Sequence, residues 1–341
     1  MTNRDTTFPA ADLRGRVCTT AGTGGARLAV LEDPVRVVLP TALAAALARA
    51  CTTQMDGHRW TAANVAAARR VLAGGSAQAL AEALTWRLGR GRPSSPGWVV
   101  LALPARLADE ELQAAAGGVL AALGTPFFSI RQAGGWLWIG QETSTAKDGA
   151  SFGGTGAQGL HIDAPNVEAI PEYTSLLVLR SDPGGGGTSL LGDLRAAVTK
   201  LGEADQEALR EPVFFEGRAD GLSGVGRPRM PFPVLEADQH GELAWVRWAA
   251  KMVEDQRNAT RAGVLERFAA ALAQTTVAVT LGRGQLLIAD QRRIAHGRTA
   301  LGPQERLADG SRRWIVQAKS TFDPAAPAHQ APGAGRTRHD G

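Results

Sequence analysis

The sequence predicts a mainly β protein with helices, an α+β fold in which short strands form a sandwich or barrel and helices cover its outside. Its 341 residues, 44% hydrophobic and 21% charged, suffice for the large core of a globular protein. Helical periodicity is concentrated in an alanine-rich region near the N-terminus, over residues 40–90. Short apolar runs separated by turn residues follow from about residue 97 to 321, a density typical of a sandwich or barrel rather than a parallel sheet.

Residues 1–26 come first, mix polar residues with glycine, and are expected to form a flexible segment. The next region has helical signals: Pro40 and Thr41 suit a helix start, and Gly74 suits a helix end. A later helix is framed by acidic residues in its first turn and by Gly124 after its last. Helices are expected over residues 41–50, 62–72, 77–88, 108–123 and 265–275.

Strands are expected over residues 98–103, 135–139, 174–180, 187–191, 213–216, 232–236, 243–247, 276–281, 285–289 and 312–319. The segment 141–158 is rich in glycine, serine and threonine and is expected to be a mobile loop. Residues 323–341, rich in proline, alanine and glycine, are expected to be a disordered tail. Between these two terminal segments, we expect a single domain over residues 27–322.

The composition excludes several classes of partner. The formal charge is +4, with lysine and arginine scattered along the chain, so nucleic-acid binding is not indicated. Cys18 and Cys51 are too few for a disulfide framework and lack the spacing of a zinc site, so we expect free thiols in a reducing compartment. With neither a secretory signal nor a membrane span expected, we predict a cytoplasmic protein. The oligomeric state is not indicated.

The pattern with the most chemical content is His161-Ile-Asp163 together with the distant His296. Alternate residues of a strand point to the same side, so His161 and Asp163 can reach one ion from a single strand or its end. His296 would come from a distant strand of the same sandwich or barrel. Two histidines and one carboxylate leave three positions of a metal open, as in non-haem Fe(II) oxygenases. Zinc can take the same ligands, so the ligand set alone does not decide the metal.

Three further segments accompany this pattern. They are Asp182-Pro-Gly-Gly-Gly-Gly-Thr188, Asp290-Gln-Arg-Arg-Ile-Ala-His296-Gly-Arg298 and Asp309-Gly-Ser-Arg-Arg313-Trp. With these segments in this order, the chain resembles the Fe(II)/2-oxoglutarate-dependent oxygenases of the taurine dioxygenase and clavaminate synthase-like superfamily. The resemblance implies a double-stranded β-helix (jelly roll) over about residues 97–321, with the helices of residues 40–90 outside it. It also implies Fe(II) as the metal, with 2-oxoglutarate and O₂ as cosubstrates.

The resemblance also assigns two residues to the cosubstrate. Arg313, which directly precedes a tryptophan, would bind the distal carboxylate of 2-oxoglutarate, for which the planar fork of a guanidinium is suited. Thr188 would donate its hydroxyl to the same carboxylate. Both residues have simpler interpretations, since Arg313 could be a surface arginine and the glycines before Thr188 suit an ordinary turn.

Two departures from the superfamily pattern concern local hydrogen bonding and the substrate. Gln291 stands where relatives usually carry asparagine, a change that keeps the amide. Gln317 stands four residues after Arg313, where relatives acting on amino acids or sulfonates often carry an arginine that binds the anionic group. We therefore expect a substrate without a free carboxylate at that point, or one held differently. Arg298 could replace the missing arginine or could simply brace its loop.

The remaining substrate residues are inferred from the segments that line the pocket in relatives. They are Gln141, Glu142, Glu168, Arg247 and Trp248, with Gln317 as a further candidate. Hydroxylases of basic amino acids often have carboxylates in the segment matching residues 246–251, whereas this chain has Arg247, Trp248 and Lys251. A basic amino acid is therefore a less favoured substrate.

The favoured hypothesis is a dioxygenase that hydroxylates an unactivated C–H bond of a small molecule, amino-acid-derived or an intermediate of secondary metabolism. Desaturation, epimerisation or cyclisation would use the same ligands. Asp163 speaks against halogenation, because halogenases of this superfamily replace the carboxylate with a small residue. The alternatives from other classes are a zinc-dependent hydrolase with a metal-bound water as nucleophile, and a non-catalytic jelly-roll partner protein.

Overall fold

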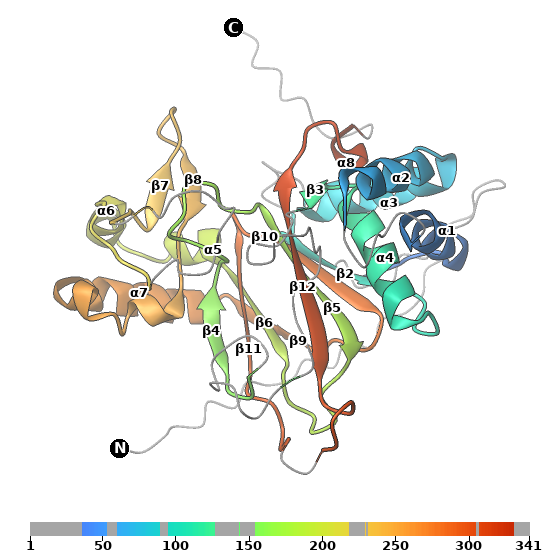
Figure 1. Ribbon diagram of the computed structural model, residues 1–341. Coiled ribbons are helices and arrows are strands. Elements are labelled where there is room, and N and C mark those ends of the chain that lie inside the picture. Colours follow the sequence, from blue (N-terminus) through green and yellow to red (C-terminus); the bar gives the residue numbers. More distant parts are fainter. Residues whose placement is uncertain are drawn as a thin grey trace, which may run out of the picture.

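The protein has a mixed α+β fold built around two β-sheets that pack face to face (Figure 1). The structure, a computed structural model, describes residues 36–52, 60–88, 95–126, 143, 154–217, 229, 231–304 and 307–330. The expected strand at 135–139 and most of the expected loop at 141–158 lie outside these residues, as does the N-terminal segment 1–26. Among the described residues, no helix is long and apolar enough to cross a bilayer.

The larger sheet has six strands in the order β1-β2-β10-β5-β12-β3. Neighbouring strands are antiparallel except for the parallel pair of β1 and β2. The strands are β1 (Arg36–Val38), β2 (Trp98–Ala102), β3 (Gly124–Pro126), β5 (Tyr173–Arg180), β10 (Gln285–Asp290) and β12 (Trp314–Phe322).

The second sheet has four antiparallel strands in the order β4-β11-β6-β9. Its strands are β4 (Gln158–His161), β6 (Ser189–Asp193), β9 (Thr276–Val279) and β11 (Ile294–Arg298). A separate hairpin pairs β7 (Leu235–Ala237) with β8 (Leu243–Val246).

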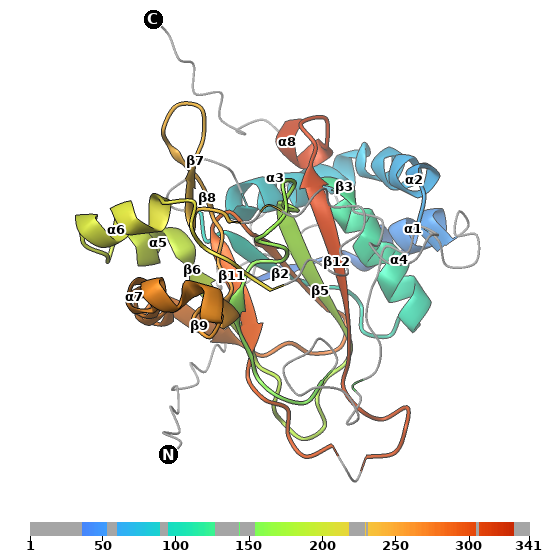
Figure 2. The same ribbon diagram turned by 60° about the vertical axis from the view of Figure 1, so that its left-hand side comes forward.

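Helices cover the outer face of each sheet (Figures 1 and 2). Beside the six-stranded sheet lie α1 (Thr41–Thr52), α2 (Ala62–Leu72), α3 (Gly75–Leu88), α4 (Asp109–Leu120) and α8 (Pro327–Gln330). Beside the four-stranded sheet lie α5 (Leu194–Val198), α6 (Glu203–Arg210) and α7 (Ala262–Ala273), with the 3-10 turns η1 (Ala250–Met252) and η2 (Gln256–Arg261).

Strand β5 shows why the central strands are apolar along their whole length. Leu177 and Leu179 pack into the core shared with helices α1 to α4, whereas Leu176 and Val178 pack into the core between the two sheets. Because successive side chains alternate between faces, a strand covered on both sides needs apolar residues at nearly every position. Polar residues on the face between the sheets are therefore exceptions, and they gather at one place, described below.

Several sequence-based predictions need correction. The expected strand at 213–216 is reduced to a single bridge between Phe214 and Phe232. The side chain of Asn258 replaces the partner strand there, because it accepts a bond from the Phe215 N–H and donates to the Phe215 carbonyl. The strand expected over 232–236 begins only at Leu235, since the prolines before it have no N–H to donate.

Residues 323–330 do not form part of a disordered tail. They contain α8, in which Ala328 is fully buried and donates its N–H to the Ala122 carbonyl at 2.9 Å. Asp323 forms an ion pair with Arg69 of α2 at 2.6 Å. These contacts attach the segment to the helical side of the larger sheet, so the predicted start of the tail at 323 was too early.

Candidate metal centre and the cavities beside it

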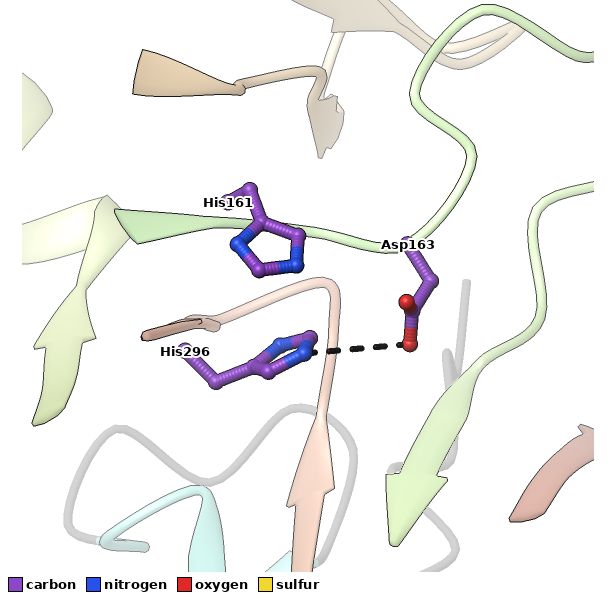
Figure 3. Close-up of side chains that lie close together, drawn as sticks. All are labelled: His161, Asp163 and His296. Carbon is purple, nitrogen blue, oxygen red and sulfur yellow. Dashed lines mark ion pairs between the residues drawn. The ribbon is translucent and has the colours of Figure 1, made fainter. Parts of the chain in front are cut away.

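Three side chains with metal-binding atoms meet at the edge of the four-stranded sheet. His161 ends β4, and His296 lies directly opposite it on β11, which is antiparallel to β4. Asp163 follows two residues after His161, where the chain leaves the strand. Figure 3 shows the two imidazole rings above one another, with the carboxylate turned towards them. The strand pairing therefore explains how residues so distant in sequence come together.

The distances suit a single ion. One potential ligand atom from each of His161, Asp163 and His296 lies within 4.8 Å of the others. His296 Nε2 is 3.9 Å from Asp163 Oδ2, and the two imidazole centroids are 4.4 Å apart. Small side-chain adjustments would let all three reach one metal at the bond lengths of about 2 Å that such ligands adopt. The residues thus fit the metal that the sequence motif predicts.

The hydrogen bonds and burial of the two histidines suit metal ligands. His161 Nδ1 is 2.8 Å from the Gly159 carbonyl oxygen, which can only accept, so Nδ1 is the donor and Nε2 is the nitrogen left for a metal. Burial, followed by the neighbouring His161, lowers the pKa of His296 to about 3. His296 is therefore neutral at physiological pH, and its ring can bind a cation without first losing a proton.

Asp163 is held in place through its backbone and its carboxylate. Its N–H donates to Gln291 Oε1 at 2.5 Å, and Gln291 Nε2 donates to the Pro171 carbonyl at 2.8 Å. The Gln317 amide donates to Asp163 Oδ2 at 3.0 Å, and Lys319 Nζ lies 3.4 Å from Oδ1. Burial by itself would raise the pKa of Asp163, but the Lys319 ammonium and the histidines hold this pKa well below its usual range. The carboxylate is thus ionised and oriented.

On one side of the three residues lies a small cavity of about 70 Å³. Its lining includes His296, Ser189, Arg298, Arg313 and Gln317. Arg313 is 6% exposed, and no described residue forms an ion pair with its guanidinium. Burial, followed by the charge of Arg298, lowers the pKa of Arg313 to about 10. A buried guanidinium aimed at a cavity is a binding site for a carboxylate, because an unpaired buried charge is costly.

Thr188 lies next to this cavity in the chain. Its backbone pairs with Thr299, and the residue that lines the cavity from the same strand is Ser189. Gly187, just before Thr188, has φ of +68°, and a Cβ there would lie 3.1 Å from Arg313 Nε. The glycine segment thus packs against Arg313. The proposed hydroxyl contact of Thr188 stays a prediction, and Ser189 is a candidate that the sequence motif did not suggest.

Arg298 lines the small cavity, but loop carbonyls occupy its guanidinium. It donates to Gly154 at 2.8 Å and to Gly156 and Thr299. These bonds favour the bracing role over the alternative in which Arg298 replaces the missing anion-binding arginine.

His161 and Asp163 also line a larger cavity of about 340 Å³. This volume falls within the range of small-molecule sites. The chain from Ile162 to Asn166 forms one wall, η1 with Lys251 forms another, and Glu216 and Lys319 add charges. Two of the three residues therefore line both a cavity suited to a cosubstrate and one suited to a second small molecule.

Only some of the predicted substrate residues lie near the cavities. Gln141 and Glu142 lie outside the described residues, and Glu168 is exposed and lines neither cavity. Gln317 binds Asp163 and Thr174, which places it beside the metal ligands.

Arg247 is 2% exposed and binds Glu236 together with the carbonyls of Pro165 and Val167. It lines neither cavity, so its position is that of a structural arginine. Trp248 is buried and packs edge-on against Phe268.

Five polar residues of the larger cavity were not predicted: Gln158, Asn166, Glu216, Lys251 and Lys319. Lys319 had a detectable signal, because a charged residue in an otherwise buried strand is unusual. Glu216 and Lys251 come from irregular segments for which the sequence offered no comparable signal.

Two imidazoles and a carboxylate on one side of an ion, with open space around the remaining positions, form the arrangement that non-haem Fe(II) oxygenases use. A hydrolytic zinc site could share these ligands, but it would leave the buried Arg313 without a purpose.

Comparison with known proteins agrees with this class. The family described as "Taurine catabolism dioxygenase TauD, TfdA family" matches residues 98–318, which include all the residues of the metal centre. The chain therefore belongs to this family of iron- and 2-oxoglutarate-dependent dioxygenases, as the sequence resemblance implied.

A curated relative is the L-asparagine oxygenase of Streptomyces coelicolor, which is 30% identical over 148 residues. That match covers 43% of this chain and 43% of the enzyme, less than half the length of either.

Two solved structures share the fold. An asparagine oxygenase in complex with Fe(II), 2S,3S-3-hydroxyasparagine and succinate has a TM-score of 0.65 and 22% identity, over 88% of this chain and 98% of that one. The non-haem iron oxygenase OrfP in complex with Fe and alpha-ketoglutaric acid has a TM-score of 0.58 and 18% identity, over 84% and 94%.

Proposed function

We propose that this protein is an Fe(II)/2-oxoglutarate-dependent dioxygenase that hydroxylates an unactivated C–H bond of a small, amino-acid-derived molecule or an intermediate of secondary metabolism. One observation carries the proposal: His161, Asp163 and His296 converge beside a small cavity that is also lined by the buried Arg313. The asparagine and arginine hydroxylated by proteins of similar fold support an amino-acid-derived substrate. Desaturation, epimerisation and cyclisation remain alternatives with the same ligands.

The proposed roles follow the contacts. His161, Asp163 and His296 would hold Fe(II), and Arg313 would bind the distal carboxylate of 2-oxoglutarate, with Thr188 as a second donor. When bound, the iron supplies the oxidising chemistry that couples decarboxylation of 2-oxoglutarate to oxidation of the substrate. The protein contributes two imidazoles, of which His296 is neutral, and the ionised carboxylate of Asp163.

The same proposal includes the architecture and location. We infer that the two sheets form a double-stranded β-helix within a single domain that begins near residue 27 and continues past residue 322 to include α8, and the face-to-face packing of the sheets supports this. We place the enzyme in the cytoplasm, and the free, buried thiol of Cys51 supports a reducing compartment. The expected partner is its small-molecule substrate.

The test is the visible spectrum of purified apoprotein after Fe(II) and 2-oxoglutarate are added without oxygen. We expect a weak charge-transfer band, and its dependence on 2-oxoglutarate concentration gives a dissociation constant. His161→Ala should abolish the band. Arg313→Met should raise the dissociation constant at least about tenfold, because it removes a charge-assisted pair of hydrogen bonds.

Arg312→Met is the matched control. Arg312 is the neighbouring arginine, yet it pairs with the exposed Asp309 at 3.0 Å and does not line the cavity. Its substitution should leave the dissociation constant for 2-oxoglutarate within about twofold of wild type, as expected for a surface pair. Absence of the band in wild type, with zinc tightly retained, would reject the dioxygenase in favour of a hydrolase.

A further inference from the structure

The larger cavity contains a buried cation that no proposed role has yet used. Lys319 lies on β12 and is only 8% exposed, and its side chain lines this cavity beside Asp163. Its neighbours Ala318 and Val316 point into the helical core, so Lys319 belongs to the face between the sheets. Lysine is rarely buried without a partner of opposite charge, because its ammonium is strongly hydrated in water.

The described partner of Lys319 is Asp163, at 3.4 Å, and this carboxylate is also a proposed metal ligand. In the loaded enzyme, the three positive charges of Fe(II) and Arg313 would equal the three negative charges of 2-oxoglutarate and Asp163. Asp163 would then no longer neutralise Lys319.

The other charges of the larger cavity do not neutralise Lys319 either. Lys251 and Glu216 form an ion pair with each other. The Glu216 backbone carbonyl accepts a bond from Asn166 Nδ2 at 2.9 Å. Counted over the described residues that line it, the cavity thus has one positive charge in excess once metal and cosubstrate are bound.

The sequence around Lys319 explains how an anion can be bound without the expected arginine. Gln317 occupies the position four residues after Arg313, and its amide is already bonded to Asp163 and Thr174. Lys319 lies two residues further along the same strand and points to the same side. The cation for the substrate's anionic group is therefore displaced by two residues, from the smaller cavity to the larger one.

We propose that Lys319 binds a carboxylate of the substrate in the larger cavity, so that the enzyme acts on a small molecule with a free carboxylate group. This inference rests on the proposed dioxygenase function. It deepens that function by adding a chemical requirement for the substrate, and it takes the second of the two sequence-based alternatives, a carboxylate that is held differently.

Acetate is a suitable probe, and acetamide is its uncharged counterpart of the same shape. The enzyme is loaded with Fe(II) and saturating 2-oxoglutarate without oxygen, and the methyl proton line of each probe is recorded by NMR. A weak ligand in fast exchange beside paramagnetic Fe(II) is broadened in proportion to the bound fraction. We expect wild type to broaden acetate and to leave acetamide nearly unchanged.

Variants identify the cation. Lys319→Met should reduce the broadening of acetate about tenfold or more, as expected for loss of a charge-assisted hydrogen bond, and Lys319→Arg should restore most of it. The control variant Glu216→Gln/Lys251→Met removes the other lysine of the same cavity together with its partner, so the net charge of the cavity does not change. It should change the broadening less than about twofold.

The outcomes separate the two proposals. The charge-transfer band of each loaded variant reports whether the iron and 2-oxoglutarate sites are intact, independently of acetate. A wild-type band without acetate broadening, or equal broadening in wild type and Lys319→Met, refutes the role of Lys319 alone. Equal effects of acetate and acetamide would mean that Lys319 only positions Asp163. Absence of the band in wild type rejects the dioxygenase itself.

Discussion

Replacement of Arg247 by methionine tests whether this residue is structural, as its contacts indicate, or binds substrate, as the sequence suggested. The guanidinium is 2% exposed and pairs with Glu236. It also donates to the carbonyls of Pro165 at 2.8 Å and Val167 at 2.7 Å. Arg247 thereby joins β8 to the segment that forms a wall of the larger cavity. Methionine has a similar length but makes none of these bonds.

The expected loss follows from the groups left behind. Removal of one partner of a buried ion pair costs about 3–5 kcal/mol. Glu236 is 18% exposed and keeps a second partner, Arg229, so the lower end of this range applies to the ion pair. Two carbonyls also lose a donor, at about 0.5–1.5 kcal/mol each. We expect a total loss of about 4 kcal/mol in the free energy of unfolding, or a fall in melting temperature of about 6 °C for a chain of this size.

Urea and thermal unfolding of Arg247→Met would measure this loss, with the variant Glu236→Leu/Arg247→Met as the control. The double variant also removes the Glu236 carboxylate, which Arg247→Met would leave without its partner. Its loss of free energy of unfolding should be smaller than the sum of the losses in the two single variants. A variant with wild-type stability but a raised KM for its substrate would refute the structural assignment and return Arg247 to the substrate site.

Two further predictions concern the glycine segment beside Arg313. Gly187→Ala should lower the free energy of unfolding by about 1 kcal/mol or more, because alanine is strained at the positive φ of this position. It should also weaken 2-oxoglutarate binding about tenfold, because the new Cβ would lie 3.1 Å from Arg313 Nε. Gly185 has a φ of +79° but no atom within 4 Å of an added Cβ, so Gly185→Ala should lower stability without weakening 2-oxoglutarate binding. Titration of the anaerobic charge-transfer band measures this binding, and equal binding by both variants would contradict the prediction. Burial would raise the pKa of Asp182, but hydrogen bonds from surrounding backbone N–H groups keep this pKa below its usual value. The carboxylate therefore stabilises the fold above about pH 4, and this stabilisation is lost as the pH falls through the lowered pKa. Asp182→Asn should therefore be less stable at pH 7 and show a shallower loss between pH 5 and 3 in urea unfolding; an unchanged pH slope would show that the hydrogen bonds do not matter.

The sequence predicted that the three residues of the candidate metal centre would meet, because the pattern that joins two of them is local. Alternation along a strand is enough to bring His161 and Asp163 to one ion, and the surrounding motifs identified His296 as the third residue. The long apolar strands such as β5 and the helices between residues 41 and 120 were similarly recognisable from their periodicity.

Residues whose surroundings form only on folding were not predictable in this way. Arg247 resembles a surface or substrate residue in the sequence, since nothing there shows that Glu236 and two carbonyls will surround it. The strand expected at Phe215 failed for the same reason, because the side chain of Asn258 takes up its backbone groups. The short helices α5 and α6 were missed because each has too few residues for a clear periodicity.

The two cavities differ in what builds them, and this difference bears on how such enzymes diversify. The smaller cavity is lined mainly from paired strands, where His296, Ser189 and Gln317 lie in the ladders of both sheets. Much of the larger cavity's wall is irregular chain, including residues 162–166 and Glu216. Insertions and exchanges are tolerated far better in loops than in sheet ladders. Substitutions and insertions in the larger cavity can thus change substrate selectivity while the residues of the smaller cavity, on the sheets, are retained.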